Sequence, residues 1–129
     1  MSDASFTHRV PDGTNVHVHG FAPDAPRAVL HILHGMGEHG ARYARLAATM
    51  NDAGFAVYAH DHRGHGRSVA NPADLGHLGD EDGFLAMVRD AHAVNRAIAA
   101  KHPGLPIVML AHSMGSFVAQ VMLFSYPDD

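Results

Sequence analysis

One serine of the chain stands in a setting that favours nucleophilic chemistry. Ser113 is the centre of the run Ala-His-Ser-Met-Gly (111–115), which follows an apolar stretch typical of a buried strand and opens an apolar stretch typical of a helix. A serine in such a strand-to-helix turn is a nucleophile elbow: its hydroxyl is exposed, and the first amides of the helix point at the charge that develops on the substrate oxygen. The alternative interpretation is an ordinary turn in which the serine caps the helix.

A second glycine-rich turn, His-Gly-Met-Gly-Glu-His (34–39), follows the first predicted buried strand. Where a nucleophile elbow is present, one N–H of such a turn is the second donor of the oxyanion hole. We therefore expect the Met36 and Met114 amides to form that hole. Because only backbone donors are needed, the methionine side chains are free to line an apolar acyl pocket. We expect His34 to fix its turn through a buried imidazole hydrogen bond. The other residues expected to support the two turns are Gly35, His112 and Gly115.

Strands alternate with helices along the chain. Nearly continuous apolar runs predict strands buried on both faces at 28–33, 55–59 and 105–110. Apolar stripes at helical spacing predict helices at 40–53, 83–101 and 114–126. A hairpin is expected before them, because Asp12-Gly13 separates two short alternating runs at 5–10 and 14–19.

This order of elements predicts an α/β fold with a mostly parallel sheet, flanking helices and right-handed crossovers. Ligands of such sheets gather beyond the carboxyl ends of the strands. The three glycine-rich turns at 34–37, 61–68 and 111–115 all follow predicted strands. The sequence therefore predicts one site at this rim of the sheet.

Three motifs follow one another along the chain: HGMGEHGARYARLA at 34–47, AHDHRGHGRS at 59–68 and AHSMGSF at 111–117. Together they resemble the α/β-hydrolase superfamily, and more narrowly its monoacylglycerol lipase and lysophospholipase-like branch. The resemblance covers nearly the whole chain. It implies a serine hydrolase that needs no cofactor and cleaves carboxylic esters of lipid-like substrates through an acyl-enzyme on Ser113. It also implies that the strands after residues 27 and 54 lie side by side, with the strand at 105–111 beyond them.

The sequence departs from this family in two places. Ala111 stands where the elbow usually begins with glycine, a difference of one methyl group. More seriously, the superfamily takes its triad acid and histidine from positions after the nucleophile, whereas this sequence stops at Asp129. We therefore expect residues 1–129 to be a single incomplete domain, the N-terminal portion of an α/β-hydrolase without its later strands and cap. Such a chain alone should be weakly active or inactive, unless His62 or His65 reaches the rim as a local base.

Thirteen histidines open a different interpretation. The spacing of His60, His62 and His65 invites a metal site, as does the pair His17 and His19 on one strand face. Loops rich in histidine and glycine more often form structural hydrogen bonds, so no metal site is predicted. A third alternative is a non-catalytic α/β module that binds an apolar ligand or a partner through its elbow face. An active-site-directed organophosphonate and metal analysis would separate these classes.

Composition excludes several classes of protein. The net charge is −4 without a basic block, so no nucleic-acid partner is expected. No apolar run reaches the ~18 residues of a transmembrane helix. There are no cysteines, which excludes disulfides and zinc–thiolate sites. The N-terminus carries no visible secretory signal, and a cytoplasmic location is expected by default.

No later element of the sequence is predicted to pack against the last strand and the last helix. Residues 106–110 are apolar on both faces, which is typical of a strand in the middle of a sheet. As the last strand of the chain it would lie at an edge, with unpaired backbone groups. The helix at 117–124 is apolar nearly all round. Besides an ester substrate, we therefore expect a partner that covers residues 105–126, either a complementary chain or a second copy of this one.

Overall fold

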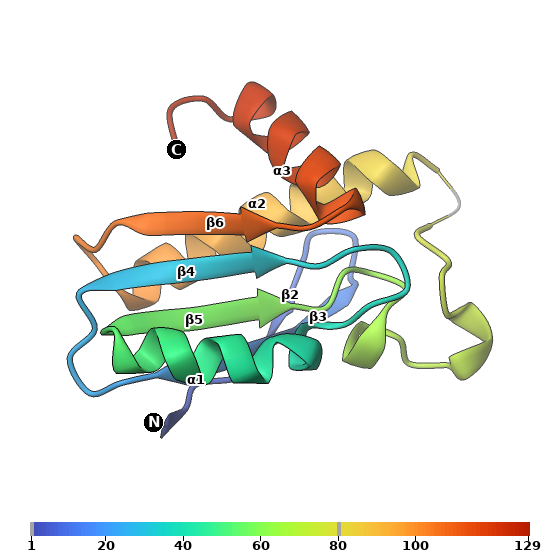
Figure 1. The fold of residues 1–129 in the computed structure, drawn as a ribbon. Helices are drawn as coiled ribbons and strands as arrows, with labels where there is room; N and C mark the ends of the chain where they lie inside the picture. The colour runs from blue at the N-terminus through green and yellow to red at the C-terminus, as the bar shows by residue number, and fades with distance from the viewer. Residues whose placement is uncertain (1, 80) are drawn as a thin grey trace.

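Two parallel strands, β4 (Ala28–Leu33) and β5 (Phe55–His60), form the centre of the sheet. All of β4 and all of β5 after its first residue are buried, as the continuous apolar runs predict. This computed structural model describes residues 2–79 and 81–129. β6 (Ile107–Ala111) pairs in parallel with β4 on the side away from β5, so the strand order implied by the resemblance is confirmed (Figure 1).

An antiparallel N-terminal segment extends the sheet beyond β5. β2 (Phe6–Arg9) and β3 (Asn15–Ala22) form the predicted hairpin, and β3 pairs antiparallel with β5. A short strand that the pattern does not predict, β1 (Ser2–Asp3), pairs with the end of β3. The fold is therefore α/β as predicted, with a mixed sheet that is parallel from β5 to β6 and antiparallel at its N-terminal side.

Helices flank both faces of this sheet (Figure 1). The predicted helix at 40–53 begins as a 3-10 turn, η1 (Gly40–Tyr43), and continues as α1 (Ala44–Asp52). α2 (Gly83–Lys101) has the predicted bounds, and α3 (Met114–Ser125) follows β6 directly. The long loop after β5 contains two short 3-10 turns, η2 (Gly66–Ser68) and η3 (Pro72–Asp74). None of the described helices is long and apolar enough to cross a membrane.

The core has two layers because alternate residues of a strand point to opposite faces. Under α1, the buried side chains are those of Leu30, Ile32, Ala47, Val57 and Ala59. On the other face, α2 covers Val16, Val18, Val29, Ala56 and Tyr58 with its Val94 and Ile98. Where α2 meets α3, the buried set is Leu33, Met87, Val88, Ala91, Val118, Ala119 and Met122.

β6 and α3 are less covered than the other elements. β6 lies at one edge of the sheet, and its Val108 and Leu110 side chains are 51% and 42% exposed. On α3, Phe117 and Phe124 are 62% and 87% exposed. The expectation that the last strand of the chain lies at an edge is therefore confirmed, but β6 is not buried on both faces, because no described element covers the face that carries Val108 and Leu110.

Candidate active site

Ser113 occupies a strained turn between β6 and α3. Its backbone has φ +54° and ψ −121°, a conformation that residues other than glycine rarely adopt and that costs of order 1–3 kcal/mol. The residue is exposed, and its hydroxyl accepts no hydrogen bond from the first turn of α3. The interpretation of Ser113 as an ordinary helix-capping serine therefore does not fit the geometry.

Gly115 allows the start of α3 to approach the end of β4. A Cβ atom at this position would lie 2.3 Å from the Leu33 carbonyl oxygen and 2.6 Å from that of His34. Backbone atoms cannot yield to such a contact, so a side chain here would push α3 away from the sheet. The first turn of α3 is thereby held against the turn at 34–37.

The turn that carries Met36 lies directly beside Ser113. A Cβ atom on Gly35 would be 3.2 Å from the Ser113 Cβ. The Glu38 N–H donates to the Gly35 carbonyl (3.2 Å) and closes a turn in which Gly37 has φ +75°. Among the described residues, no acceptor engages the N–H of Met36 or that of Met114. Two backbone donors without a protein partner thus belong to the two turns that flank the serine.

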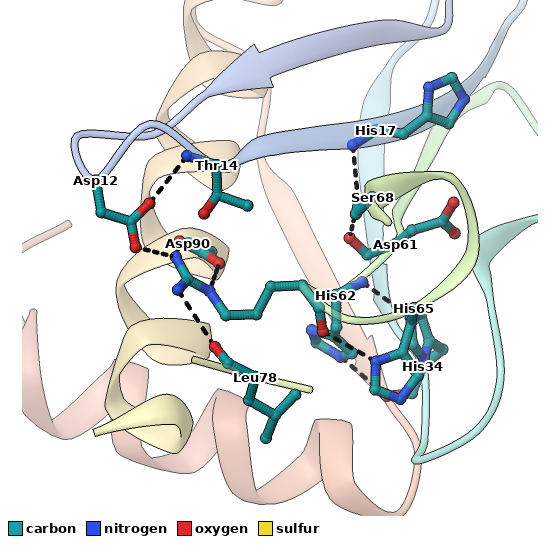
Figure 2. A network of polar contacts seen from close by, with 11 residues as sticks. Asp12, Thr14, His17, His34, Asp61, His62, His65, Ser68, Leu78 and Asp90 are labelled. Atoms are coloured by element: carbon teal, nitrogen blue, oxygen red, sulfur yellow. Dashed lines mark hydrogen bonds and ion pairs between the residues drawn. The ribbon is translucent and has the colours of Figure 1, made fainter. Parts of the chain in front are cut away.

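His34 is fully buried behind this turn and is hydrogen-bonded at both ring nitrogens. Its Nδ1–H donates to the Gly35 carbonyl (2.7 Å), and its Nε2 accepts from the His62 N–H (3.0 Å). The His62 Nε2–H donates in return to the His34 carbonyl (3.0 Å) (Figure 2). Burial lowers the pKa of His34 and lowers that of His62 to about 3, so both rings are neutral near pH 7.

Glu38 connects the two turns, and nothing in the local sequence singles it out. Its largely buried carboxylate accepts from the Gly35 N–H (3.3 Å) and the Tyr43 hydroxyl (2.8 Å). It also pairs with Arg42 (2.9 Å) and with the His112 Nδ1 (3.2 Å). Burial alone would raise the pKa of Glu38, but these donors lower it, so the carboxylate is ionised. The exposed His112 ring therefore faces Glu38 and is not bonded to Ser113.

The loop after β5 is anchored through Asp61. Its carboxylate accepts from the Gly40 N–H (2.6 Å), the Arg67 N–H (2.8 Å) and the His19 ring (3.0 Å). Although burial opposes ionisation, these donors lower the pKa of Asp61 to about 2. His65 is also buried, with its Nδ1–H donating to the Arg63 carbonyl (3.0 Å). The idea that His62 or His65 serves as a local base is therefore wrong, because both rings are enclosed in this loop.

Arg63 holds the same loop to the rest of the fold. Its guanidinium donates twice to the Asp90 carboxylate on α2 (2.6 and 2.9 Å) and once to Asp12 in the hairpin turn (2.7 Å). It also donates to the Leu78 carbonyl farther along the loop (3.3 Å) (Figure 2). These contacts are structural: they fix the path of the chain behind the candidate site.

Two of the histidines considered as metal ligands, His60 and His19, have other partners. His60 accepts from His31 across the two central strands (2.9 Å), and His31 accepts in turn from the Asn95 amide (3.1 Å). Burial lowers the pKa of His31 to about 3 and that of His60 well below its usual range. His19 is bound to Asp61. In residues 2–79 and 81–129, no three histidine or carboxylate side chains are grouped so that they could hold a metal ion.

Residues 24–129 match the family model Hydrolase_4, described as Serine aminopeptidase, S33. The chain is 39% identical over 110 residues to the monoacylglycerol lipase of Mycolicibacterium smegmatis, a match that covers 84% of this chain and 37% of that protein. It is 37% identical over 94 residues to the monoglyceride lipase of Homo sapiens, covering 73% of this chain and 29% of that protein. The chain thus spans about a third of the length of these curated relatives.

Solved structures agree with the sequence relatives. A thermostable carboxyl esterase from Bacillus coagulans, crystallised in complex with glycerol, superposes with a TM-score of 0.88 at 32% identity. The superposition covers 99% of this chain and 42% of that one. The family match, the relatives and the shared fold together show that the chain belongs to the Serine aminopeptidase, S33 family of α/β-hydrolases, in the branch similar to monoglyceride lipases.

Proposed function

We propose that this chain provides the nucleophile and the oxyanion hole of a serine esterase. One observation carries the proposal: Ser113 is strained and exposed, and its hydroxyl does not cap α3. It lies beside two backbone N–H groups that have no acceptor among the described residues. Lipid-like carboxylic esters are the proposed substrates, of the monoacylglycerol or lysophospholipid type. This class is supported by relatives named monoacylglycerol lipase and monoglyceride lipase.

In the proposed reaction, the Ser113 Oγ attacks the ester carbonyl carbon and its proton passes to a histidine base. The Met36 and Met114 N–H groups donate hydrogen bonds to the negatively charged oxygen that forms from the carbonyl, a contribution typically worth about 10²–10³ in rate per donor. The alcohol leaves with a proton, and water then releases the acid from Ser113. The reaction requires no metal or cofactor.

We propose that the base and its acid come from sequence outside these residues. His34 and His62 are buried, neutral and hydrogen-bonded, and His112 faces Glu38, so none of them is placed to take a proton from Ser113. The chain would then be one part of a single α/β-hydrolase domain. Its length, about a third of that of its relatives, supports this proposal.

The edge beside β6 is the surface where the remaining part would dock, whether it is continuous with this chain, a complementary chain or a second copy. A cavity of about 330 Å³ lies on one face of β6, lined in part by Ile107, Met109 and Met122. Another of about 300 Å³ lies beside Leu110 on the other face. Each large apolar side chain left uncovered forgoes ~1.5–3 kcal/mol of burial. Light scattering should therefore show a species heavier than 13.8 kDa, whereas a dilute monomer of that mass with cooperative unfolding would refute a partner.

Labelling with a fluorophosphonate, carried out on the assembled protein that also contains the proposed histidine base, tests the catalytic proposal. We expect the reagent to modify Ser113, identified by peptide mass mapping, and to fail on Ser113→Ala. Ser125→Ala, at the exposed far end of α3, is the matched control and should be labelled like the wild type. Hydrolysis of a monoacylglycerol and a lysophospholipid by the labelled and unlabelled protein then tests the substrate class. Equal labelling of Ser113→Ala would refute the assignment.

A further inference from the structure

Ser116, in the first turn of α3, directs both of its donors at a single oxygen. Its hydroxyl donates to the Ser113 carbonyl at 2.7 Å, and its backbone N–H donates to the same oxygen at 2.9 Å. A carbonyl oxygen has two lone pairs, and here both accept hydrogen bonds from Ser116. The Ser113 carbonyl is thus held by two hydrogen bonds from one residue.

That carbonyl controls the direction of a proposed oxyanion donor. The Ser113 C=O and the Met114 N–H belong to one planar trans peptide group and point in opposite directions. Anything that fixes the oxygen therefore fixes the N–H. The restraint matters here because Ser113 is strained at φ +54° and ψ −121°, and relaxation of ψ would rotate this same peptide group.

The second proposed donor is held in the same way by unrelated residues. The Gly35 carbonyl accepts from the His34 Nδ1–H (2.7 Å) and from the Glu38 N–H (3.2 Å). Its peptide group carries the Met36 N–H, which points the opposite way. Both amides without a protein acceptor thus belong to peptide groups whose carbonyl oxygens have two donors each.

We propose that Ser116 is a positioning residue which, through the Ser113 carbonyl, keeps the Met114 N–H directed at the substrate oxygen. This inference rests on the proposed esterase function. Ser116 does not itself touch the reacting atoms. Its hydroxyl restrains the peptide group before the reaction, so that the group does not have to reorient when charge develops on the substrate.

Ser116→Ala tests this role in the form of the protein in which Ser113 is labelled. The variant keeps the backbone bond and loses only the hydroxyl, so we expect the rate of fluorophosphonate labelling and kcat for a short-chain ester to fall about fivefold, the factor that corresponds to one neutral hydrogen bond. KM should not change. Ser116→Thr, which retains the hydroxyl, should restore the rate, and Ser125→Ala on the same helix should behave like the wild type.

A direct measurement accompanies the kinetics. With ¹⁵N-methionine labelling, the six backbone amides of the methionines after Met1 can be resolved, and the Met114 signal should move in Ser116→Ala and stay in place in Ser125→Ala. Wild-type labelling rates in Ser116→Ala, a change in KM alone, or an unmoved Met114 signal would each overturn the positioning role while the esterase proposal stands. If the assembled wild-type protein, with the proposed base present, is not labelled at Ser113, the esterase proposal and the positioning role are refuted together.

Discussion

Acidification should destabilise the fold through its buried histidines. His31, His34, His60 and His62 lie inside the molecule, and burial lowers the pKa of each. In the unfolded chain the same side chains titrate near pH 6.5. Between these two limits the unfolded state binds protons that the folded state cannot accept, so stability is fully present above about pH 6.5 and falls as the pH decreases.

The size of the effect follows from the two residues with the best-defined shifts. The pKa values of His31 and His62 are about 3 in the folded state. The linkage between protonation and folding then lowers the free energy of unfolding by up to about 1.4 kcal/mol per pH unit for each residue. At pH 5 the reduction relative to neutral pH is about 2 kcal/mol for each residue. Together they remove about 4 kcal/mol, a large fraction of the ~5–15 kcal/mol that stabilises a typical domain. Asp61 adds nothing in this range because its pKa of about 2 keeps it ionised.

Urea denaturation between pH 7.5 and pH 5 measures this loss. His31→Gln is the informative variant, because an amide can accept from Asn95 and donate to His60 but cannot take up a proton in this range. Its stability should depend on pH less steeply than that of the wild type by about 1.4 kcal/mol per pH unit, whatever its absolute stability. The exposed His39→Gln is the control and should keep the wild-type slope. If the free energy of unfolding were the same at pH 5 and pH 7.5, or if His31→Gln kept the full slope, the reasoning would be wrong.

Three further substitutions test the contacts around the site. Gly115→Ala should lower the free energy of unfolding by about 1–3 kcal/mol, because its Cβ would lie 2.3 Å from the Leu33 carbonyl; an unchanged urea midpoint would contradict the packing argument. Asp61→Asn should lower the free energy of unfolding at pH 7 by about 2–3 kcal/mol, measured in the same way, because it removes the charge that three donors share. A loss no larger than the experimental error, about 0.5 kcal/mol, would contradict this argument. Glu38→Gln keeps an acceptor for the turn but loses its charge, so fluorophosphonate labelling should slow by about three- to tenfold; wild-type labelling would show that the link between the two turns is dispensable.

The sequence predicts those features whose signals are local. β4 and β5 are nearly continuous apolar runs, and a run of that kind is stable only where both of its faces are covered. α2 has the predicted bounds because its apolar stripe repeats at helical spacing over its whole length. The position of Ser113 between a strand and a helix follows from the neighbouring elements alone. β6 is different: its apolar pattern calls for cover on both faces, and whether that cover exists depends on residues other than its own.

The features that the sequence does not predict depend on partners far away in the chain. His31 interrupts an apolar strand, and it is tolerated there because His60, 29 residues away, and Asn95, 64 residues away, bond both of its ring nitrogens. Glu38 looks like any loop carboxylate until the fold brings His112 to it from the end of the neighbouring strand β6. Each of these residues needs a hydrogen-bond partner, because a buried polar group without one costs about 1–3 kcal/mol. The loops of the candidate site are thus held by neutral imidazoles and by single carboxylates with several donors, which makes their geometry sensitive to pH and to the loss of any one partner.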